Sequence, residues 1–348
     1  MAKAERAGPL TIGGERIAPG ERRTIELPLA RVFSHVELNM VVQIARGRRA
    51  GPTLCVCAGL HGDEINGVEI LRRLLKSSAL SRIRGTLIAV PVVNMFGFLQ
   101  QTRYLPDRRD LNRSFPGSER GSLAARLAHL FMTEIVANCD HAIDLHTGAI
   151  HRTNLPQIRA CLERDETPRM AQAFGAPVII DAPLREGSLR AAAHERGIPM
   201  LVYEGGEALR FDELAIRVGV RGVTSVMREL GMLPKSRGHK PTHTPTVALD
   251  SSWVRSPDSG ILQHRVPLGS RVRTGDTLGV VVNPFGEGEG HIVAPNGGIV
   301  IGMTQIPLLN EGDAAFHIAS VQRPGTVEKA VEALQATYDA NDPDEDYT

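Results

Sequence analysis

The first residues that could do chemistry are His61 and Glu64, three positions apart in a short polar loop. An apolar run at 53–58 predicts a buried strand before the loop, and apolar residues repeated at intervals of three and four from 65 to 75 predict a helix after it. A catalytic zinc takes three protein ligands and leaves one position open. The pair therefore predicts part of a metal site if a third ligand arrives, and otherwise indicates a helix start with a solvated histidine.

His146 is the candidate third ligand, because it stands at the end of a predicted strand over 141–148. Parallel strands bring their carboxyl ends to one edge of a sheet, where open α/β sheets bind ligands. We therefore expect His61, Glu64 and His146 to form a site for one Zn²⁺ per chain. Asp144, on the same strand face, either fixes the tautomer of His146 or caps a loop; the sequence favours neither.

Glu204 is the candidate general base. It ends the predicted strand over 199–204, and Gly205 and Gly206 follow, which leaves room for a ligand beside the backbone. A carboxylate near a metal-activated water can accept its proton. The alternative is a helix N-terminal cap or a surface carboxylate.

Three polar residues of the long segment 95–117 complete the candidate site. Amide hydrolysis creates an oxyanion, and a fixed guanidinium such as that of Arg103 would stabilise the charge. Asn112 and Arg113 could bind a substrate carboxylate from adjacent positions. The alternative is a solvated arginine-rich loop, which composition alone would favour.

Strands and helices alternate over most of the chain, which predicts an α/β domain with a largely parallel sheet. Segments 23–29 and 35–44 alternate apolar and polar residues and predict antiparallel edge strands. The predicted inner strands are 53–58, 85–94, 141–148, 177–181 and 199–204, and the predicted helices are 65–75, 122–138, 167–175, 187–197 and 211–230.

After Pro234 the composition changes to short apolar segments divided by glycines. We expect a catalytic domain at 1–235, a linker at 236–246, a small all-β domain at 247–325, and a terminal helix with an acidic tail at 326–348. Segments 269–279 and 294–300 resemble a biotinyl/lipoyl-type barrel-sandwich. No lysine lies between Lys240 and Lys329, so an attached cofactor is not expected, and the domain should instead shape or cover the site entrance.

Composition predicts a soluble globular protein, since the 348 residues are 42% hydrophobic and 23% charged. A net charge of +1 gives no electrostatic reason to expect nucleic acid or membrane as a partner. The N-terminus lacks an apolar signal region, so a cytoplasmic location is expected. The four cysteines lack paired metal or redox spacing, and Cys55 and Cys57 fit a strand core.

Four motifs in order resemble the succinylglutamate desuccinylase/aspartoacylase family, a relative of the zinc carboxypeptidases. They are His61-Gly-Asp-Glu64, Asp110-Leu-Asn-Arg-Ser-Phe-Pro-Gly117, Asp144-Leu-His-Thr-Gly148 and Tyr203-Glu-Gly-Gly206. The resemblance covers residues 50–320. It implies a carboxypeptidase-like domain with a mostly parallel mixed sheet between helices. It also implies zinc on His61, Glu64 and His146, Glu204 as base and acid, Arg103 at the oxyanion, and Asn112 with Arg113 on the substrate carboxylate.

The predicted function is a zinc amidohydrolase that removes an acyl group from an N-acyl amino acid or a related small carboxylate-bearing amide. A zinc carboxypeptidase acting on peptides is the near alternative. A non-catalytic metal-containing binding protein is the alternative from another class, although a structural zinc normally has four protein ligands. The expected partner is a small molecule, and homo-oligomer formation is left open.

Overall fold

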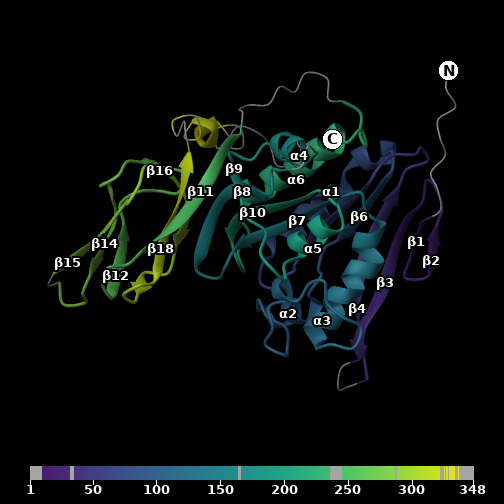
Figure 1. Cartoon of the computed structure of the whole chain (residues 1–348), viewed down its shortest axis with the longest axis horizontal. Helices are drawn as coiled ribbons and strands as arrows, with labels where there is room; N and C mark the ends of the chain where they lie inside the picture. The colour runs from purple at the N-terminus through teal and green to yellow at the C-terminus, as the bar shows by residue number, and fades with distance from the viewer. Residues whose placement is uncertain are drawn as a thin grey trace.

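The protein is described here from a computed structural model, which covers residues 10–31, 35–163, 166–235, 245–286 and 288–321, with 325, 327, 329–333 and 336. Figure 1 shows helices on both faces of a central sheet, and the C-terminal strands, coloured green to yellow, extending from one side of it. No helix among the described residues is long and apolar enough to span a membrane.

Four parallel strands form the middle of the N-terminal part of the sheet, in the spatial order β10-β7-β5-β6. Their bounds are β5 (Thr53–Ala58), β6 (Thr86–Val90), β7 (His141–Gly148) and β10 (Met200–Glu207). β5, β6 and β7 are buried along almost their whole length, as strands covered on both faces should be. The predicted inner strands at 53–58, 85–94, 141–148 and 199–204 are therefore present.

The predicted edge strands are also present beside β6. β4 (Glu37–Arg46) pairs antiparallel with β6, and β3 (Arg22–Arg31) pairs antiparallel with β4 at the end of the sheet. A separate two-stranded hairpin contains β1 (Leu10–Ile12) and β2 (Glu15–Ile17).

One strand next to the site was not predicted. β8 (Arg152–Ala160) pairs antiparallel with β10 and parallel with β9 (Val178–Asp181), so the sheet is mixed on this side. Its polar side chains and Pro156 hide the strand pattern in the sequence. The backbone pairs with β10 and β9, and Arg152, Asn154 and Arg159 line a cavity.

Helices pack in two groups against alternate side chains of the strands. One face carries α1 (Asn66–Lys76), α4 (Glu166–Phe174) and α6 (Glu213–Glu229), and the other carries α3 (Leu123–Leu130) and α5 (Leu189–Glu195). Cys55 and Cys57 are buried in the core between the sheet and the helices α3 and α5, as predicted. Gly231 ends α6 with a φ of 71°, where glycine is favoured.

Two helical details differ from the sequence prediction. The segment 95–117 is not a loop throughout, because α2 (Met95–Gln100) begins it with Asn94 as its cap. The helix predicted over 122–138 starts at the Ser122 cap but continues after α3 as the π turn Phe131–Ile135 and the 3-10 turn Val136–Asn138.

The C-terminal strands continue the same sheet. β11 (Thr246–Arg255) pairs parallel with β9, and β16 (Gly298–Thr304) pairs with β8, so twelve described strands form one sheet. The other members on this side are β13 (Arg271–Val272) and β18 (Ala314–Val321). A second sheet contains β12 (Gly260–His264), β14 (Thr277–Val282), β15 (Glu289–Val293) and β17 (Leu308–Leu309).

Several of these strands match the predicted short segments, but β17 and β18 were not predicted from the sequence. The domain division stays a prediction. Most of the predicted linker, at 236–244, and the tail at 341–348 lie outside the described residues, while those described between 325 and 336 are helical.

Candidate metal centre and catalytic cavity

The loop between β5 and α1 places His61 and Glu64 at the carboxyl edge of the sheet. It passes very close to α2: a Cβ built on Gly62 would lie 1.9 Å from the carbonyl carbon of Gly97. Only glycine fits there, so the sequence His-Gly-Asp-Glu fixes the loop path as well as two ligands. The Glu64 amide also donates to the carbonyl of His61, at 3.2 Å, which closes a tight turn.

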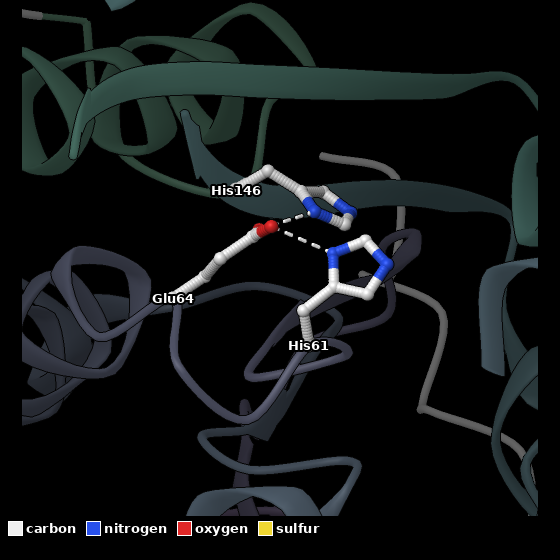
Figure 2. Close-up of side chains that lie close together, drawn as sticks. All are labelled: His61, Glu64 and His146. Atoms are coloured by element: carbon white, nitrogen blue, oxygen red, sulfur yellow. Dashed lines mark hydrogen bonds and ion pairs between the residues drawn. The ribbon is translucent and has the colours of Figure 1, made fainter. Parts of the chain in front are cut away.

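The carboxylate of Glu64 points toward both imidazoles, as Figure 2 shows. Its Oε1 is 2.7 Å from Nδ1 of His61, and its Oε2 is 2.6 Å from Nδ1 of His146. One ligand atom from each of the three residues lies within 4.8 Å of the others, and all three side chains are buried. The structure thus brings together the three predicted ligands, two from the loop and one from β7.

The far nitrogen of each ring faces a carboxylate. His146 Nε2 is 2.7 Å from Asp144 Oδ2, and His61 Nε2 is 3.1 Å from Asp110 Oδ1. An ionised carboxylate only accepts hydrogen bonds, so each Nε2–H donates to its carboxylate, and each Nδ1 faces Glu64 either as a second N–H or, with a cation bound, as a lone pair. Two lone pairs facing one carboxylate need protons or a cation between them. This donor set fits a divalent metal, since ligating histidines usually donate their other N–H to a carboxylate.

The charges of the cluster shift its titrations strongly. Burial alone would raise the pKa of Glu64, but the charges of His61 and His146 hold it well below its usual range. Burial would lower the pKa of His146, yet the charges of Asp144 and Glu64 raise it well above its ordinary value. The same charges favour protonated rings when no cation is bound, and a bound metal would displace those protons.

Arg103 contacts the same cluster. Its guanidinium lies 3.3 Å from Glu64 Oε1 and donates to Asp110 Oδ2 at 3.0 and 3.2 Å. Burial would lower its pKa, but the charges of Glu64 and Asp110 raise it, so the group remains a cation. A positive group fixed beside the three ligands is placed to meet negative charge that develops there.

Glu204 lies directly beside His146 in the parallel ladder of β10 and β7. Its Oε2 accepts a hydrogen bond from Asn154 Nδ2 at 2.6 Å, and its Oε1 is 3.4 Å from Arg159 Nε. Both partners come from β8. The carboxylate is therefore held by two side chains of that strand and is not a helix cap.

A cavity of about 640 Å³ joins all seven predicted site residues. Asn112 lines it from the turn Leu111–Arg113, and its Oδ1 accepts the amide of Leu189 at the start of α5, at 2.9 Å. Arg113 lies beside it, with a pKa lowered by burial and by the charges of Arg185 and Arg103, against the pull of Asp110.

Sequence reasoning missed the other side of the cavity. The additional lining residues include Asn154 and Arg159 on β8, Arg190 on α5, Trp253 on β11 and His317 on β18. β8 and β18 were not predicted as strands, so their side chains could not be placed. The rings of Trp253 and His317 stack at 4.7 Å, and Arg152 lies over the indole at 5.1 Å. The C-terminal strands therefore form one wall of the cavity.

Comparison with known proteins gives consistent matches. The model of the succinylglutamate desuccinylase/aspartoacylase catalytic domain matches residues 50–230, just over half of the chain. The N-alpha-acetyl-L-2,4-diaminobutyric acid deacetylase of Halomonas elongata is 27% identical over 314 residues, which are 85% of this chain and 90% of that protein.

Solved structures show the same architecture. A succinylglutamate desuccinylase/aspartoacylase from Rhodobacter sphaeroides superposes with a TM-score of 0.76 at 25% identity, covering 86% of this chain and 95% of that one. A succinylglutamate desuccinylase from a Silicibacter species has a TM-score of 0.78 at 24% identity, covering 92% and 100%, and supports the fold. The chain belongs to the succinylglutamate desuccinylase/aspartoacylase family.

Proposed function

We propose that the protein is a zinc-dependent deacylase that hydrolyses the amide bond of an N-acyl amino acid or a related small carboxylate. The observation that carries the proposal is the arrangement of His61, Glu64 and His146 as three buried ligands with Glu204 on the adjacent strand. Family membership supports amide hydrolysis, because the Halomonas relative is named as a deacetylase of an N-acetylated amino acid.

Zinc, when bound, supplies a Lewis acid that polarises the scissile carbonyl and lowers the pKa of water. Glu204 then serves as the base that takes a proton from water and returns it to the leaving nitrogen. Asn154 and Arg159 keep the Glu204 carboxylate in place through contacts of 2.6 and 3.4 Å. Arg103 faces the same centre with a fixed positive charge, which stabilises the oxyanion of the transition state.

Asn112 and Arg113 are proposed to bind the substrate carboxylate. Both line the cavity beside the metal ligands, and Arg113 offers the planar donor pair that matches a carboxylate. A volume of about 640 Å³ suits a small molecule. Peptide hydrolysis by a carboxypeptidase mechanism remains the alternative, and dipeptide substrates distinguish it.

The architecture and role of the C-terminal strands, and the location of the protein, are also proposals. We infer that residues 247–325 are a barrel-sandwich domain, supported by the core cluster shared between the second sheet and strands β16 and β18. Its role would be to close the cavity, since Trp253 and His317 come from it. A cytoplasmic location is proposed from the sequence alone.

The test is turnover of N-acetyl amino acids, N-succinyl amino acids and dipeptides, with wild type and Glu204→Gln compared after zinc is restored. The variant should lose about 10²- to 10⁴-fold in kcat, because the amide cannot accept the proton. Glu207→Gln is the matched control: Glu207 is on the same strand, but accepts the amide of His151 at 3.1 Å instead of lining the cavity. An unchanged rate in Glu204→Gln would refute the role, and dipeptides as the only substrates would favour the peptidase.

A further inference from the structure

A second cavity, of about 750 Å³, lies at the opposite edge of the sheet from the metal ligands. It is bordered by the segments that precede β5 and β6, the end of β4, and the chain that follows α6. β5 and β6 run away from it toward the catalytic edge, so the two cavities are separated by the length of the strands, roughly 20 Å. None of its lining residues lines the catalytic cavity.

The lining of this cavity is strongly basic. Six arginines contribute, and no aspartate or glutamate is among its described lining residues. The six are Arg22, Arg46, Arg48, Arg49, Arg82 and Arg84. Arg46 is buried, with 5% of its surface exposed, while the other five are exposed. Such a concentration stands out in a chain whose net charge is only +1.

The five exposed guanidinium groups have no counter-charge in contact with them among the described residues. In the part of the chain that the structure describes, none of Arg22, Arg48, Arg49, Arg82 and Arg84 makes a side-chain hydrogen bond or ion pair. The nearby carboxylate of Glu21 is engaged elsewhere, since it accepts the amide of Ala18 and a guanidinium hydrogen of Arg23. The positive field reaches α6: burial lowers the pKa of Arg228, and the charges of Arg221 and Arg82 lower it further.

A rigid backbone framework carries these arginines. The amide of Gly47 donates to the carbonyl of Gly85 at 2.8 Å, and the amide of Gly85 donates to the carbonyl of Arg49 at 3.0 Å. The amide of Arg84 donates to the carbonyl of Met232, at 2.8 Å, which ties in the end of α6. A Cβ at Gly47 would lie 2.2 Å from the carbonyl oxygen of Ile83, so the two loops approach as only glycine allows. Three chain segments are thus fixed around one concavity before any ligand binds.

We propose that this cavity is a binding site for a small polyphosphate anion of the pyrophosphate and nucleoside triphosphate class. Guanidinium groups bind phosphate oxygens in pairs, and several converging groups match a ligand with several charges. A second copy of the chain is a poor occupant, because a two-fold contact would place the same arginines against each other. A duplex nucleic acid needs an extended basic face, whereas this basic surface is a pocket in a nearly neutral protein.

The experiment measures binding of pyrophosphate and of ATP to the full chain by calorimetry, without added divalent metal. Both should bind saturably with one site per chain, and the double variant Arg49→Glu/Arg82→Glu should bind at least tenfold more weakly. The matched control is Arg120→Glu/Arg126→Glu, since these arginines are also exposed and without a described side-chain partner but line neither cavity. The control should change affinity less than twofold.

Comparing the affinities for pyrophosphate and ATP shows whether the site binds the phosphate chain alone or also the nucleoside. Equal affinity for pyrophosphate and ATP assigns the site to the phosphate chain alone, and tighter ATP binding adds a contact to the nucleoside. Three results would overturn the proposal: no saturable binding of either anion, equal weakening in both double variants, or an oligonucleotide that displaces pyrophosphate with an affinity that rises with its length. Deacylation of the best substrate should be unchanged in both variants, which keeps this test independent of the proposed catalytic function.

Discussion

The two edges of the same sheet differ in how their charged side chains are balanced. At the carboxyl edge, His61, Glu64 and His146 are buried, and charged partners lie within 3.3 Å of each of them. At the amino edge, five exposed arginines surround a cavity without a partner in the described part of the chain. The first edge holds its charge in a closed network that requires a cation or protons. The second presents unbalanced positive charge that an anion from solution would compensate.

This difference shows how one set of strands can carry two kinds of site. The loops at the carboxyl edge place the proposed ligand atoms at fixed positions inside the protein, so the identity of each side chain should matter. The arginine cavity relies on the number and sign of its charges, so single changes there should matter less.

The strongest test of the closed network is Asp144→Asn. In the wild type, the Asp144 carboxylate lies 2.7 Å from His146 Nε2. The asparagine can still accept this hydrogen bond, but it carries no charge to support the ring as a ligand. Zinc affinity should fall about 10- to 100-fold, measured by competition with a chelator of known affinity. Asp140→Asn is the control, because Asp140 accepts the amide of Thr53 away from the ligands and should leave affinity within twofold. Equal affinity in Asp144→Asn and wild type would show that the network does not tune the metal site.

The next test concerns His317, a buried group of the same cavity whose Nδ1 has no hydrogen-bond partner among the described residues. Burial, and then the charge of Arg159, lowers the pKa of His317 to about 3. Because the unfolded chain takes up this proton at a pKa near 6.5, stability should fall as pH drops from 6.5 toward 3. By pH 5 this single group should cost about 2 kcal/mol relative to pH 7.

His317→Phe keeps a ring against Trp253 and removes the titration. Urea unfolding at pH 7 and pH 5 should therefore show a smaller pH-dependent loss in the variant than in wild type, by about 2 kcal/mol. His129→Phe, an exchange on α3 outside both cavities, serves as the control. The same slope in wild type and His317→Phe would mean that His317 is protonated in the folded protein.

The smallest effect is expected at the arginine cavity itself. Arg49→Ala/Arg82→Ala removes like charges, so the free energy of unfolding should rise by about 0.5 kcal/mol or less at low ionic strength. The gain should disappear in 1 M salt, because screening acts over about 3 Å there. Arg169→Ala should shift stability the other way, since it breaks an ion pair with Glu229 at 2.6 Å. A loss of stability in the double variant would show that these arginines have internal partners.

The sequence predicted the catalytic edge better than any other part of the molecule. His61 and Glu64 follow a strongly apolar strand, and His146 ends another, so strand-end placement is enough to bring them together. The role of Asp110 as the partner of His61 could not be predicted, because the contact spans 49 residues and depends on how the long loop folds.

The rest of the fold was harder to predict where polar side chains face a cavity. β8 carries Asn154 and Arg159 toward Glu204, and these residues interrupt the apolar alternation that marks a strand. The pairing of β16 with β8 is also invisible in sequence, because it joins segments more than a hundred residues apart. The arginine cavity has no motif at all: its charges come from three separated segments.

The most direct test of the metal centre is elemental analysis of the protein purified without chelators, alongside His146→Ala with its fold checked by circular dichroism. We expect one zinc per chain in wild type, a large loss in His146→Ala, and turnover that disappears on chelation and returns with zinc. Wild-type protein that contains no stoichiometric divalent metal, and that turns over an N-acyl amino acid equally well after chelation, would contradict the account.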